Sequence, residues 1–437
     1  MQSIIGLRRE DKNPWERRVP LIPSHIRELI QEHGLEFIVQ PSSIRIFRDD
    51  DFLLEGARVE EDLSPCPVVF AVKEIPIPLL AAGRTYLFFS HTIKGQERNR
   101  PLLRRLMDLG CTLIDYEKIV DDQGRRLLFF GKQAGEAGMV DTLWALGRRL
   151  KQEGLETPFV RLLQMYHYTN LVEAKEEVAR AAHDIREKGL PEQIVPLVAG
   201  FTGYGHVSQG AQEIYNLLPV AEIAPEEFAE FMKRGNFSPH RVYKIVFHEH
   251  QMVRPREVDR LFDLQEYYRS PELYEAVLEP FLKHLTVLVN GIYWAPKYPR
   301  FVTKAHIRKL FDGPSRPRLR VIGDISCDIE GGIECTLMST DPKDPVFVYD
   351  PVRDAALPGL EGPGPVIMSV DNLPAEISLE SSIFFSQALK PFVPAIARAE
   401  YGASFEDSNL PPPIKRAAIL WRGEFTPPYE YVNEYLR

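Results

Sequence analysis

The sequence predicts an α/β fold with two domains, each built on a parallel β-sheet with helices between its strands. Two observations and one general rule support this. Short apolar runs alternate with segments of helical periodicity, residues 196–210 combine a strand, a glycine turn and a helix, and parallel strands need such crossover helices. The chain has 437 residues, enough for two or three domains of roughly 100–200 residues.

The first predicted sheet lies within residues 1–135. Its strands are short apolar runs that each end in a polar residue: VVFAVKE (68–74), TYLFFSH (85–91) and CTLIDYE (111–117). Helical patterns separate and follow such runs, as at 24–33 and 98–109. Residues 136–153 carry apolar side chains at helical spacing, so we expect an interdomain helix over 136–154.

The second predicted sheet lies within residues 155–377. Its strand-like runs are PLVAGFT (196–202), PVAEIA (219–224), LTVLVNGIYW (285–294) and RLRVIGDISCD (318–328). The proline- and glycine-rich stretch 351–365 is expected to be a loop. Residues 377–399 predict one long helix that returns the chain to the first domain, which then comprises 1–135 and about 378–437. The tail that contains Pro411–Pro413 is expected to be packed but irregular.

The composition excludes several classes of protein. The net charge is −9 and no long basic run occurs, so we expect no nucleic-acid partner. No apolar run approaches the roughly 20 residues of a membrane helix, and the charged start has no signal- or transit-peptide pattern. Four cysteines without a C-x-x-C pair argue for a reducing compartment and against zinc. The expected location is the cytoplasm, and the oligomeric state stays open.

The stretch PLVAGFTGYGHVSQG, residues 196–210, predicts a nucleotide-binding turn between a strand and an amphipathic helix. Gly203 permits the tight turn, and Gly205 lets the backbone approach a pyrophosphate at the positive end of the helix. The match is imperfect, because Ser208 stands where a third glycine is expected and Gly210 follows it. The residues expected to bind the cofactor are Gly203, Gly205, His206, Val207 and Ser208. An ordinary glycine-rich turn is the simpler alternative.

Lys73 and His91 are candidate acid–base groups because each ends an apolar strand, where ligands bind in open α/β sheets. Histidine titrates near neutrality, and burial lowers the pKa of a lysine, so both can exchange protons with a substrate. Glu74 and Glu117 lie at comparable strand ends and can supply a counter-charge. A surface lysine and a hydrogen-bonded core histidine are the simpler alternatives.

Other charged residues suggest substrate contacts. Arginines bind carboxylates with two parallel hydrogen bonds, so the cluster near Pro14 suits a diacid or an amino acid. Its members are Arg8, Arg9, Arg17 and Arg18. Asp324 and Asp328 close the last strand-like run and can face a nicotinamide or a bound amine. His248 and His250 share one strand face, but two histidines alone do not hold a metal, so no metal site is predicted.

The choice between NAD(H) and NADP(H) leans weakly towards NADP(H). The acid that binds the adenosine ribose normally ends the second strand, about 20 residues after the first glycine. Here Glu222 and Glu226 flank that place without filling it, while Lys233 and Arg234 follow and can accept a 2′-phosphate.

These motifs together resemble the lysine–2-oxoglutarate reductase domain of bifunctional aminoadipic semialdehyde synthase and, more distantly, the lysine-forming saccharopine dehydrogenases and the N-terminal half of alanine dehydrogenases. The resemblance covers nearly the whole chain. The stretches that carry it are LRRED…ERRVPLIP (7–23), AVKEIP (71–76), FFSHTIKGQ (88–96), LIDYEKIVDDQGRRL (113–127), FTGYGHVSQGAQ (201–212), NGIYW (290–294), GDISCDIEGGIE (323–334) and SVDNLPAEI (369–377).

The resemblance implies two Rossmann-like domains that flank an interdomain cleft. It also implies an NAD(P)-dependent oxidoreductase that condenses lysine with 2-oxoglutarate and reduces the imine to saccharopine, or runs the reverse reaction. By the same resemblance Lys73 and His91 are the acid–base pair, Glu117 neutralises lysine, Arg18 binds a substrate carboxylate and Asp328 lies near the nicotinamide and the amine. Two alternatives stay open: an amino-acid dehydrogenase of the alanine type, and a non-catalytic nucleotide-binding regulator.

Overall fold

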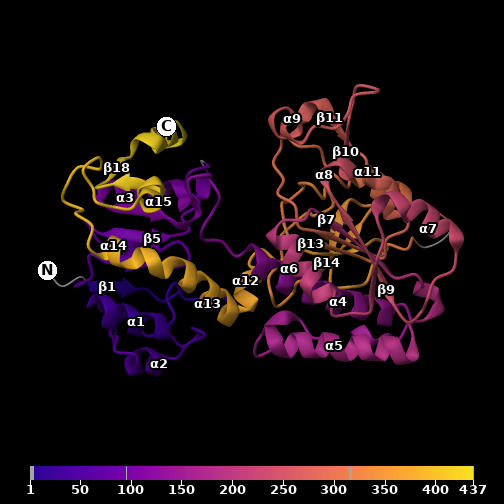
Figure 1. Ribbon diagram of the computed structural model, residues 1–437, viewed down its shortest axis with the longest axis horizontal. Coiled ribbons are helices and arrows are strands. Elements are labelled where there is room, and N and C mark those ends of the chain that lie inside the picture. The colour runs from indigo at the N-terminus through magenta and orange to yellow at the C-terminus, as the bar shows by residue number, and fades with distance from the viewer. Residues whose placement is uncertain (1–3, 95, 314–316, 437) are drawn as a thin grey trace. The chain divides into compact units, whose positions relative to one another are not determined.

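The computed structural model describes residues 4–94, 96–313 and 317–436, so Gly95 of the FFSHTIKGQ stretch lies outside the described residues. The chain divides into two compact units, residues 1–130 with 378–437, and residues 131–377. Each unit holds one sheet with eight strands among the described residues. The predicted α/β class with two parallel-dominated sheets is therefore confirmed (Figure 1).

The sheet of the first unit runs β18-β17-β6-β5-β4-β1-β2-β3. Its strands are β1 (Ile4–Leu7), β2 (Glu36–Val39), β3 (Arg58–Val59), β4 (Val68–Phe70), β5 (Thr85–Phe88), β6 (Thr112–Asp115), β17 (Ala418–Trp421) and β18 (Glu424–Phe425). Strands β1 to β6 are parallel, whereas β17 and β18 join antiparallel at the edge. The strand order reverses between β1 and β4, and open α/β sheets bind ligands beyond the strand ends at such a point.

The helices of the first unit cover both faces of this sheet. They are α1 (Pro23–His33), α2 (Asp49–Leu54), α3 (Arg100–Asp108), α13 (Ser378–Leu389), α14 (Val393–Ala397), α15 (Pro412–Ala417) and α16 (Asn433–Leu436). Helix α13 is tied to the N-terminal segment, because the hydroxyls of Ser382 and Ser386 accept hydrogen bonds of 3.0 Å from the backbone of Val19 and Ile22.

Two expectations for the C-terminal region were wrong. The single helix predicted over 377–399 is broken, because a 3₁₀ turn at Lys390–Phe392 separates α13 from α14. Pro391 and Pro394 explain the break, since proline lacks an N–H and its ring clashes with the preceding turn. The tail is also more regular than predicted, because it supplies β17 and β18 to the first sheet.

The sheet of the second unit runs β15-β14-β16-β13-β12-β7-β9-β8. Its strands are β7 (Val198–Thr202), β8 (Val220–Glu222), β9 (Val242–Phe247), β12 (Val287–Asn290), β13 (Val321–Asp324), β14 (Val346–Asp350), β15 (Ala355–Pro358) and β16 (Val366–Met368). A separate hairpin pairs β10 (Val253–Pro255) with β11 (Tyr274–Ala276). The stretch 351–365, predicted as a loop, contains β15, which pairs antiparallel with β14.

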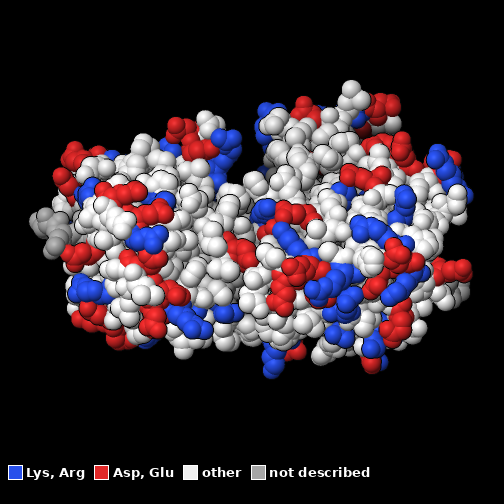
Figure 2. Space-filling model, turned by 60° about the horizontal axis from the view of Figure 1, so that its bottom comes forward, with Lys and Arg blue, Asp and Glu red and all other residues white. Residues whose placement is uncertain are grey.

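The helices of the second unit begin with α4 (Gly131–Gln152), which covers the interdomain helix expected over 136–154 except for its last two residues and begins five residues earlier. The others are α5 (Leu171–Lys188), α6 (His206–Tyr215), α7 (Phe228–Arg234), α8 (Glu249–Met252), α9 (Leu264–Arg269), α10 (Glu279–Leu282), α11 (Lys304–Phe311) and α12 (Leu373–Glu376). Among the residues described, no helix is long and apolar enough to cross a membrane. Acidic and basic side chains are interspersed on the face shown in Figure 2.

Glycines let α4 and α6 pack against each other at very short range. A Cβ on Gly135 would lie 2.0 Å from the carbonyl oxygen of Val207, and a Cβ on Gly210 would lie 2.1 Å from that of Lys132. Because both residues are glycines, no side chain separates α4 from α6 where the two helices cross. This contact fixes the helix that begins at the predicted nucleotide turn.

Two carboxyl groups meet in the interior of the second unit. Asp141 of α4 is fully buried and Glu376 of α12 is 8% exposed. The backbone N–H of Met165 donates to Asp141 Oδ1 at 2.7 Å. Burial, and then the charge of Asp141, raise the pKa of Glu376 well above its ordinary value, and burial raises the pKa of Asp141. The raised pKa values favour a proton shared by the two carboxyls, which would allow them to lie together.

Replacement of Glu376 by glutamine is expected to stabilise the second unit at neutral and alkaline pH. Because the folded-state pKa is raised, the folded chain binds more protons than the unfolded chain above about pH 4, so wild-type stability falls as the pH rises. Glutamine donates to Asp141 without needing that proton. We expect the free energy of unfolding to rise by about 1–3 kcal/mol at pH 8 and by less at pH 5, as measured by urea unfolding. The exposed Glu187→Gln on α5 is the control, and an equal effect of both substitutions would contradict the shared proton.

Candidate active site

Three predicted side chains follow neighbouring parallel strands of the first unit. Strands β4, β5 and β6 end at Phe70, Phe88 and Asp115. Lys73, His91 and Glu117 come two or three residues later, so all three lie beyond the same edge of the sheet. This edge includes the reversal point between β1 and β4, where ligands bind in such sheets.

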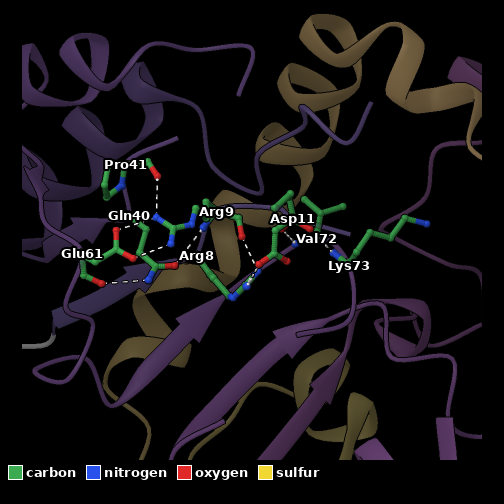
Figure 3. Close-up of polar contacts among 9 residues, drawn as sticks. Arg8, Arg9, Asp11, Gln40, Pro41, Glu61, Val72 and Lys73 are labelled. Carbon is green, nitrogen blue, oxygen red and sulfur yellow. Dashed lines mark hydrogen bonds and ion pairs between the residues drawn. The ribbon is translucent and has the colours of Figure 1, made fainter. Parts of the chain in front are cut away.

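The backbone of Lys73 is fixed by hydrogen bonds, while its side-chain amine is left to interact with a ligand. The carboxylate of Glu10, which follows β1, accepts hydrogen bonds from the backbone N–H of Val72 at 2.7 Å and of Lys73 at 3.0 Å. Figure 3 shows the Lys73 side chain extending away from these contacts. Within the described part of the chain, no hydrogen bond or ion pair involves the Lys73 amine. Burial, and then the positive charge of Arg18, lower the pKa of this amine, which favours the neutral form that can take up a proton.

A buried ion pair lies near this amine. Arg18 donates from Nε and Nη2 to the two carboxylate oxygens of Glu16, each at 2.7 Å, and both side chains are almost fully buried. The guanidinium carbon of Arg18 lies 4.4 Å from the centre of the Phe130 ring. The pKa of Glu10 is raised by burial and then by the negative charge of Glu16. Arg18 is thus rigidly placed, and its charge acts on Lys73.

The other N-terminal arginines have partners in the same region. Arg9 forms two hydrogen bonds with Glu61, of 2.6 and 2.7 Å, and Arg8 pairs with Asp11 at 2.5 Å (Figure 3). Arg17 donates to the carbonyl oxygen of Ile44 at 3.1 Å. Of the predicted cluster, Arg18 is the member whose charge acts on Lys73.

His91 is oriented by a carboxylate. Its Nδ1 lies 2.8 Å from Glu74 Oε1, and Lys12 pairs with the other Glu74 oxygen at 2.7 Å. Burial acts to raise the pKa of Glu74, but the hydrogen bonds from His91 and Lys12 prevail and lower it to about 2. Because Glu74 is ionised, Nδ1 carries the hydrogen and Nε2 is left to exchange a proton with a ligand. The backbone of His91 is left-handed, with a φ of 50°, and Asn99 donates to its carbonyl at 2.9 Å.

Glu117 faces two exposed cations. It forms ion pairs with Arg126 and, at 3.6 Å, with Lys94. Asp115, the last residue of β6, accepts a 2.8 Å hydrogen bond from the backbone N–H of Glu117. The carboxylate is thus placed to attract a positively charged group at the strand edge.

The glycine turn of the second unit has the predicted local form. Gly203 follows β7 with a φ of 77°, and its N–H donates to the carbonyl of Phe247 at 2.9 Å. Gly205 caps α6, and nothing lies within 4 Å of where its Cβ would be. His206, Val207 and Ser208 form the first turn of α6, where N–H groups lack acceptors within the helix and can meet phosphate oxygens. The space beside Gly205 and this turn fit a dinucleotide pyrophosphate.

Ser208, in the place of the third glycine, is buried, and its hydroxyl accepts a 3.0 Å hydrogen bond from Gln212. A Cβ on Gly291 of the NGIYW stretch would lie 3.1 Å from the Ser208 backbone nitrogen. Close packing of α6 against α4 depends instead on Gly210, two residues later. The glycine motif therefore has Gly210 rather than a glycine at position 208, because α6 contacts α4 at Gly210.

A chain of buried polar side chains crosses the ends of β7, β12 and β13. Asn290 joins Thr202 Oγ1 at 2.7 Å to Asp324 Oδ1 at 2.8 Å, and Asp324 Oδ2 accepts from Thr336 at 2.6 Å. Burial raises the pKa of Asp324 to about 6. Asp324 thus anchors the loop after β13 within the interior, whereas Asp328, further along that loop, is partly exposed.

The structure does not place the end of β8, where the sequence predicted the adenosine ribose to bind, beside β7. Strand β9, which sequence analysis missed, lies between β7 and β8. Glu222 of β8 pairs with Lys244 of β9 at 2.8 Å. Lys233 and Arg234 end α7, whose Phe231 packs on Tyr243 near the start of β9, so they lie towards its amino end. The alternation of apolar residues in VYKIVF (242–247) was the signal that could have revealed this strand.

His248 and His250 do not share a strand face, because β9 ends at Phe247 and His250 lies on α8. Their ring centres are 6.0 Å apart. Among the described residues, no three His, Cys, Asp or Glu side chains are grouped so that they could hold a metal ion.

Comparison with known proteins shows what this chain is similar to. Residues 6–137 match the family model "Alanine dehydrogenase/PNT, N-terminal domain". Over 449 aligned positions, 98% of this chain is 38% identical to the alpha-aminoadipic semialdehyde synthase of Arabidopsis thaliana. The chain is similar to the alpha-aminoadipic semialdehyde synthases over nearly its whole length. It spans 41% of the length of the plant protein.

Two further relatives extend this comparison. The NAD(+)-dependent, L-lysine-forming saccharopine dehydrogenase of Emericella nidulans is 28% identical over 403 residues, which cover 89% of this chain and 90% of that protein. An L-alanine dehydrogenase structure superposes with a TM-score of 0.62 at 18% identity and covers 99% of this chain and all of its own. The latter likeness shows the fold.

Proposed function

We propose that this chain is an NAD(P)-dependent oxidoreductase that joins lysine to 2-oxoglutarate to form saccharopine, or oxidises saccharopine in the reverse direction. The observation that carries the proposal is the Lys73 amine with its lowered pKa, placed beyond the same strand edge as His91, whose Nδ1 is held by Glu74. Similarity to the alpha-aminoadipic semialdehyde synthases supports the same activity. The first unit is the substrate domain and the second is the dinucleotide domain.

The acid–base pair accounts for the proton transfers. The ε-amine of lysine must lose a proton before it adds to the ketone, and the neutral Lys73 amine accepts that proton. The carbinolamine must then lose its hydroxyl as water, and His91 supplies a proton from Nε2. NAD(P)H supplies hydride to the imine carbon when bound. Glu74 keeps the imidazole in one orientation throughout.

Three charged side chains are assigned to the substrates in this proposal. The family resemblance assigns a carboxylate of 2-oxoglutarate to Arg18, whose Nε and Nη2 already hold Glu16. Glu117 balances the charge of the lysine substrate, and Asp328 lies near the amine and the nicotinamide. The turn from Gly203 to Ser208 holds the pyrophosphate. NADP(H) as the preferred donor and a cytoplasmic location stay predictions.

The activity is tested by incubating the purified chain with NADPH or NADH and 2-oxoglutarate, and recording the loss of absorbance of the reduced nicotinamide. We expect lysine to stimulate oxidation of the nucleotide, with saccharopine as the product. Stimulation by ammonium instead of lysine would identify an amino-acid dehydrogenase of the alanine type. If neither amine stimulates oxidation of either nucleotide, the proposal is refuted.

Substitution of His91 by asparagine is expected to lower kcat by about 10²–10⁴-fold, the usual contribution of a positioned acid–base group. NADPH binding should change little, because the predicted nucleotide turn lies in the second unit. Steady-state kinetics and a nucleotide titration measure the two effects. His33→Asn, at the end of α1, is the matched control and should retain full turnover. Unchanged turnover of His91→Asn would remove His91 from the mechanism.

A further inference from the structure

The sheet of the second unit has an unusual strand order at its nucleotide-binding half. In dinucleotide-binding folds, the strand that follows the glycine-turn helix lies beside the first strand, and its last residue binds the adenosine ribose. Here that strand, β8, lies at the edge, and β9 takes the place beside β7. Thr202 of β7 pairs with Phe247 of β9, so the residue after Phe247 lies level with Gly203. That residue is His248.

The end of β8 lies away from this position. Its last residue, Glu222, pairs in register with Lys244, three residues before the end of β9. The Glu222 carboxylate forms an ion pair with the Lys244 amine at 2.8 Å. Glu222 therefore lies level with the middle of β9 and is bound to a cation there.

His248 packs against the glycine turn. Its imidazole stacks on the ring of Tyr204, with centroids 4.4 Å apart and planes inclined by 21°. Tyr204 is the residue between Gly203 and Gly205, so this stack forms one wall beside the predicted pyrophosphate site. An imidazole at this place offers N–H donors, whereas the usual carboxylate only accepts hydrogen bonds.

The nearby acids are already engaged. Glu249 is buried and accepts a 2.8 Å hydrogen bond from the hydroxyl of Tyr268. Glu226, on the connection after β8, is exposed and accepts a 2.5 Å hydrogen bond from Gln251. The hydrogen bond from Gln251 lowers the pKa of Glu226, and the charges of His250 and His248 lower it further. Because Glu226 is exposed whereas Glu249 is buried, Glu226 is the acid that could give up its present partner and compete with His248 for the ribose.

We infer that His248, at the end of β9, contacts the 2′ position of the adenosine ribose and favours a 2′-phosphate over a free hydroxyl. This inference rests on the proposed function, because it assumes that the second unit binds a nicotinamide dinucleotide. A ribose diol needs an acceptor at this place, whereas a phosphate needs donors. His248 donates to the phosphate, and the exposed His250 lies beside it with its ring centre 6.0 Å away.

The test measures Kd for NADPH and for NADH by fluorescence titration of the full chain, without substrates. His248→Asp restores the usual acid and is expected to lower the ratio of Kd(NADH) to Kd(NADPH) by at least about tenfold, the effect of losing a hydrogen bond to a charged group. Glu222→Gln, at the end of the strand that normally binds the ribose, is the matched control and should leave the ratio unchanged. His248→Asn, which keeps a polar side chain of similar reach, should give a smaller shift in the same direction and serves if the aspartate variant does not fold.

Two results would overturn the inference while the proposed function survives. One is an unchanged ratio in folded His248→Asp and His248→Asn proteins that still bind nucleotide. The other is a wild-type preference for NADH that Glu226→Gln abolishes, because Glu226 would then bind the ribose diol. If the wild-type chain binds neither nucleotide, the proposed function itself fails, and this inference fails with it.

Discussion

Replacement of Lys73 by methionine is expected to lower kcat by about 10²–10⁴-fold, the range for loss of a positioned acid–base group. Methionine has a similar length but cannot accept a proton. The amine of Lys73 lies where burial and the charge of Arg18 lower its pKa, so the wild-type side chain is partly neutral at a lower pH than an ordinary lysine. Steady-state assays with lysine and 2-oxoglutarate measure the loss.

The control for this prediction is Lys415→Met on α15, which removes another lysine of the first unit and should retain turnover. Binding of NADPH should persist in Lys73→Met, because the predicted nucleotide turn belongs to the second unit. The acidic limb of the wild-type pH profile of kcat/KM should also be lost in the variant. A variant with normal turnover would show that Lys73 only shapes the site, and the chemistry would need a different base.

Alanine substitutions at Gly205 and Gly210 are expected to separate nucleotide binding from stability. A Cβ on Gly205 meets no atom within 4 Å, and its φ of −73° suits any residue. Gly205→Ala should therefore leave the free energy of unfolding within about 0.5 kcal/mol. It should weaken NADPH binding, because the added methyl group lies where the backbone is expected to approach the pyrophosphate.

A Cβ on Gly210, by contrast, would lie 2.1 Å from the carbonyl oxygen of Lys132, which is backbone and cannot rotate away. Gly210→Ala should therefore force α6 away from α4 and reduce the free energy of unfolding by about 1–3 kcal/mol or more. Urea unfolding gives the free energy of unfolding of each variant, and nucleotide titration gives its Kd for NADPH. Equal destabilisation by the two substitutions would contradict the assigned helix contact, and normal NADPH binding by Gly205→Ala would contradict the nucleotide turn.

Local patterns in the sequence determined much of the candidate site. Lys73, His91 and Glu117 were found because each closely follows a short apolar strand, and parallel strands bring their carboxyl ends to one edge. The glycine turn at 203–205 was found because a positive φ next to a helix start depends on a few consecutive residues. These features need only neighbours in the chain, so periodicity and residue type predict them.

The tertiary structure alone decided what those residues meet. Groups from separate segments meet where Glu74 pairs with His91, where the backbone N–H of Lys73 donates to Glu10, and where the buried carboxyls of Asp141 and Glu376 lie together. The order of β8 and β9, which places β9 rather than β8 beside β7, likewise depends on which strands pair across the sheet. Strand pairing and burial arise from contacts between distant segments, and they set the pKa values and the partners that local sequence patterns do not contain.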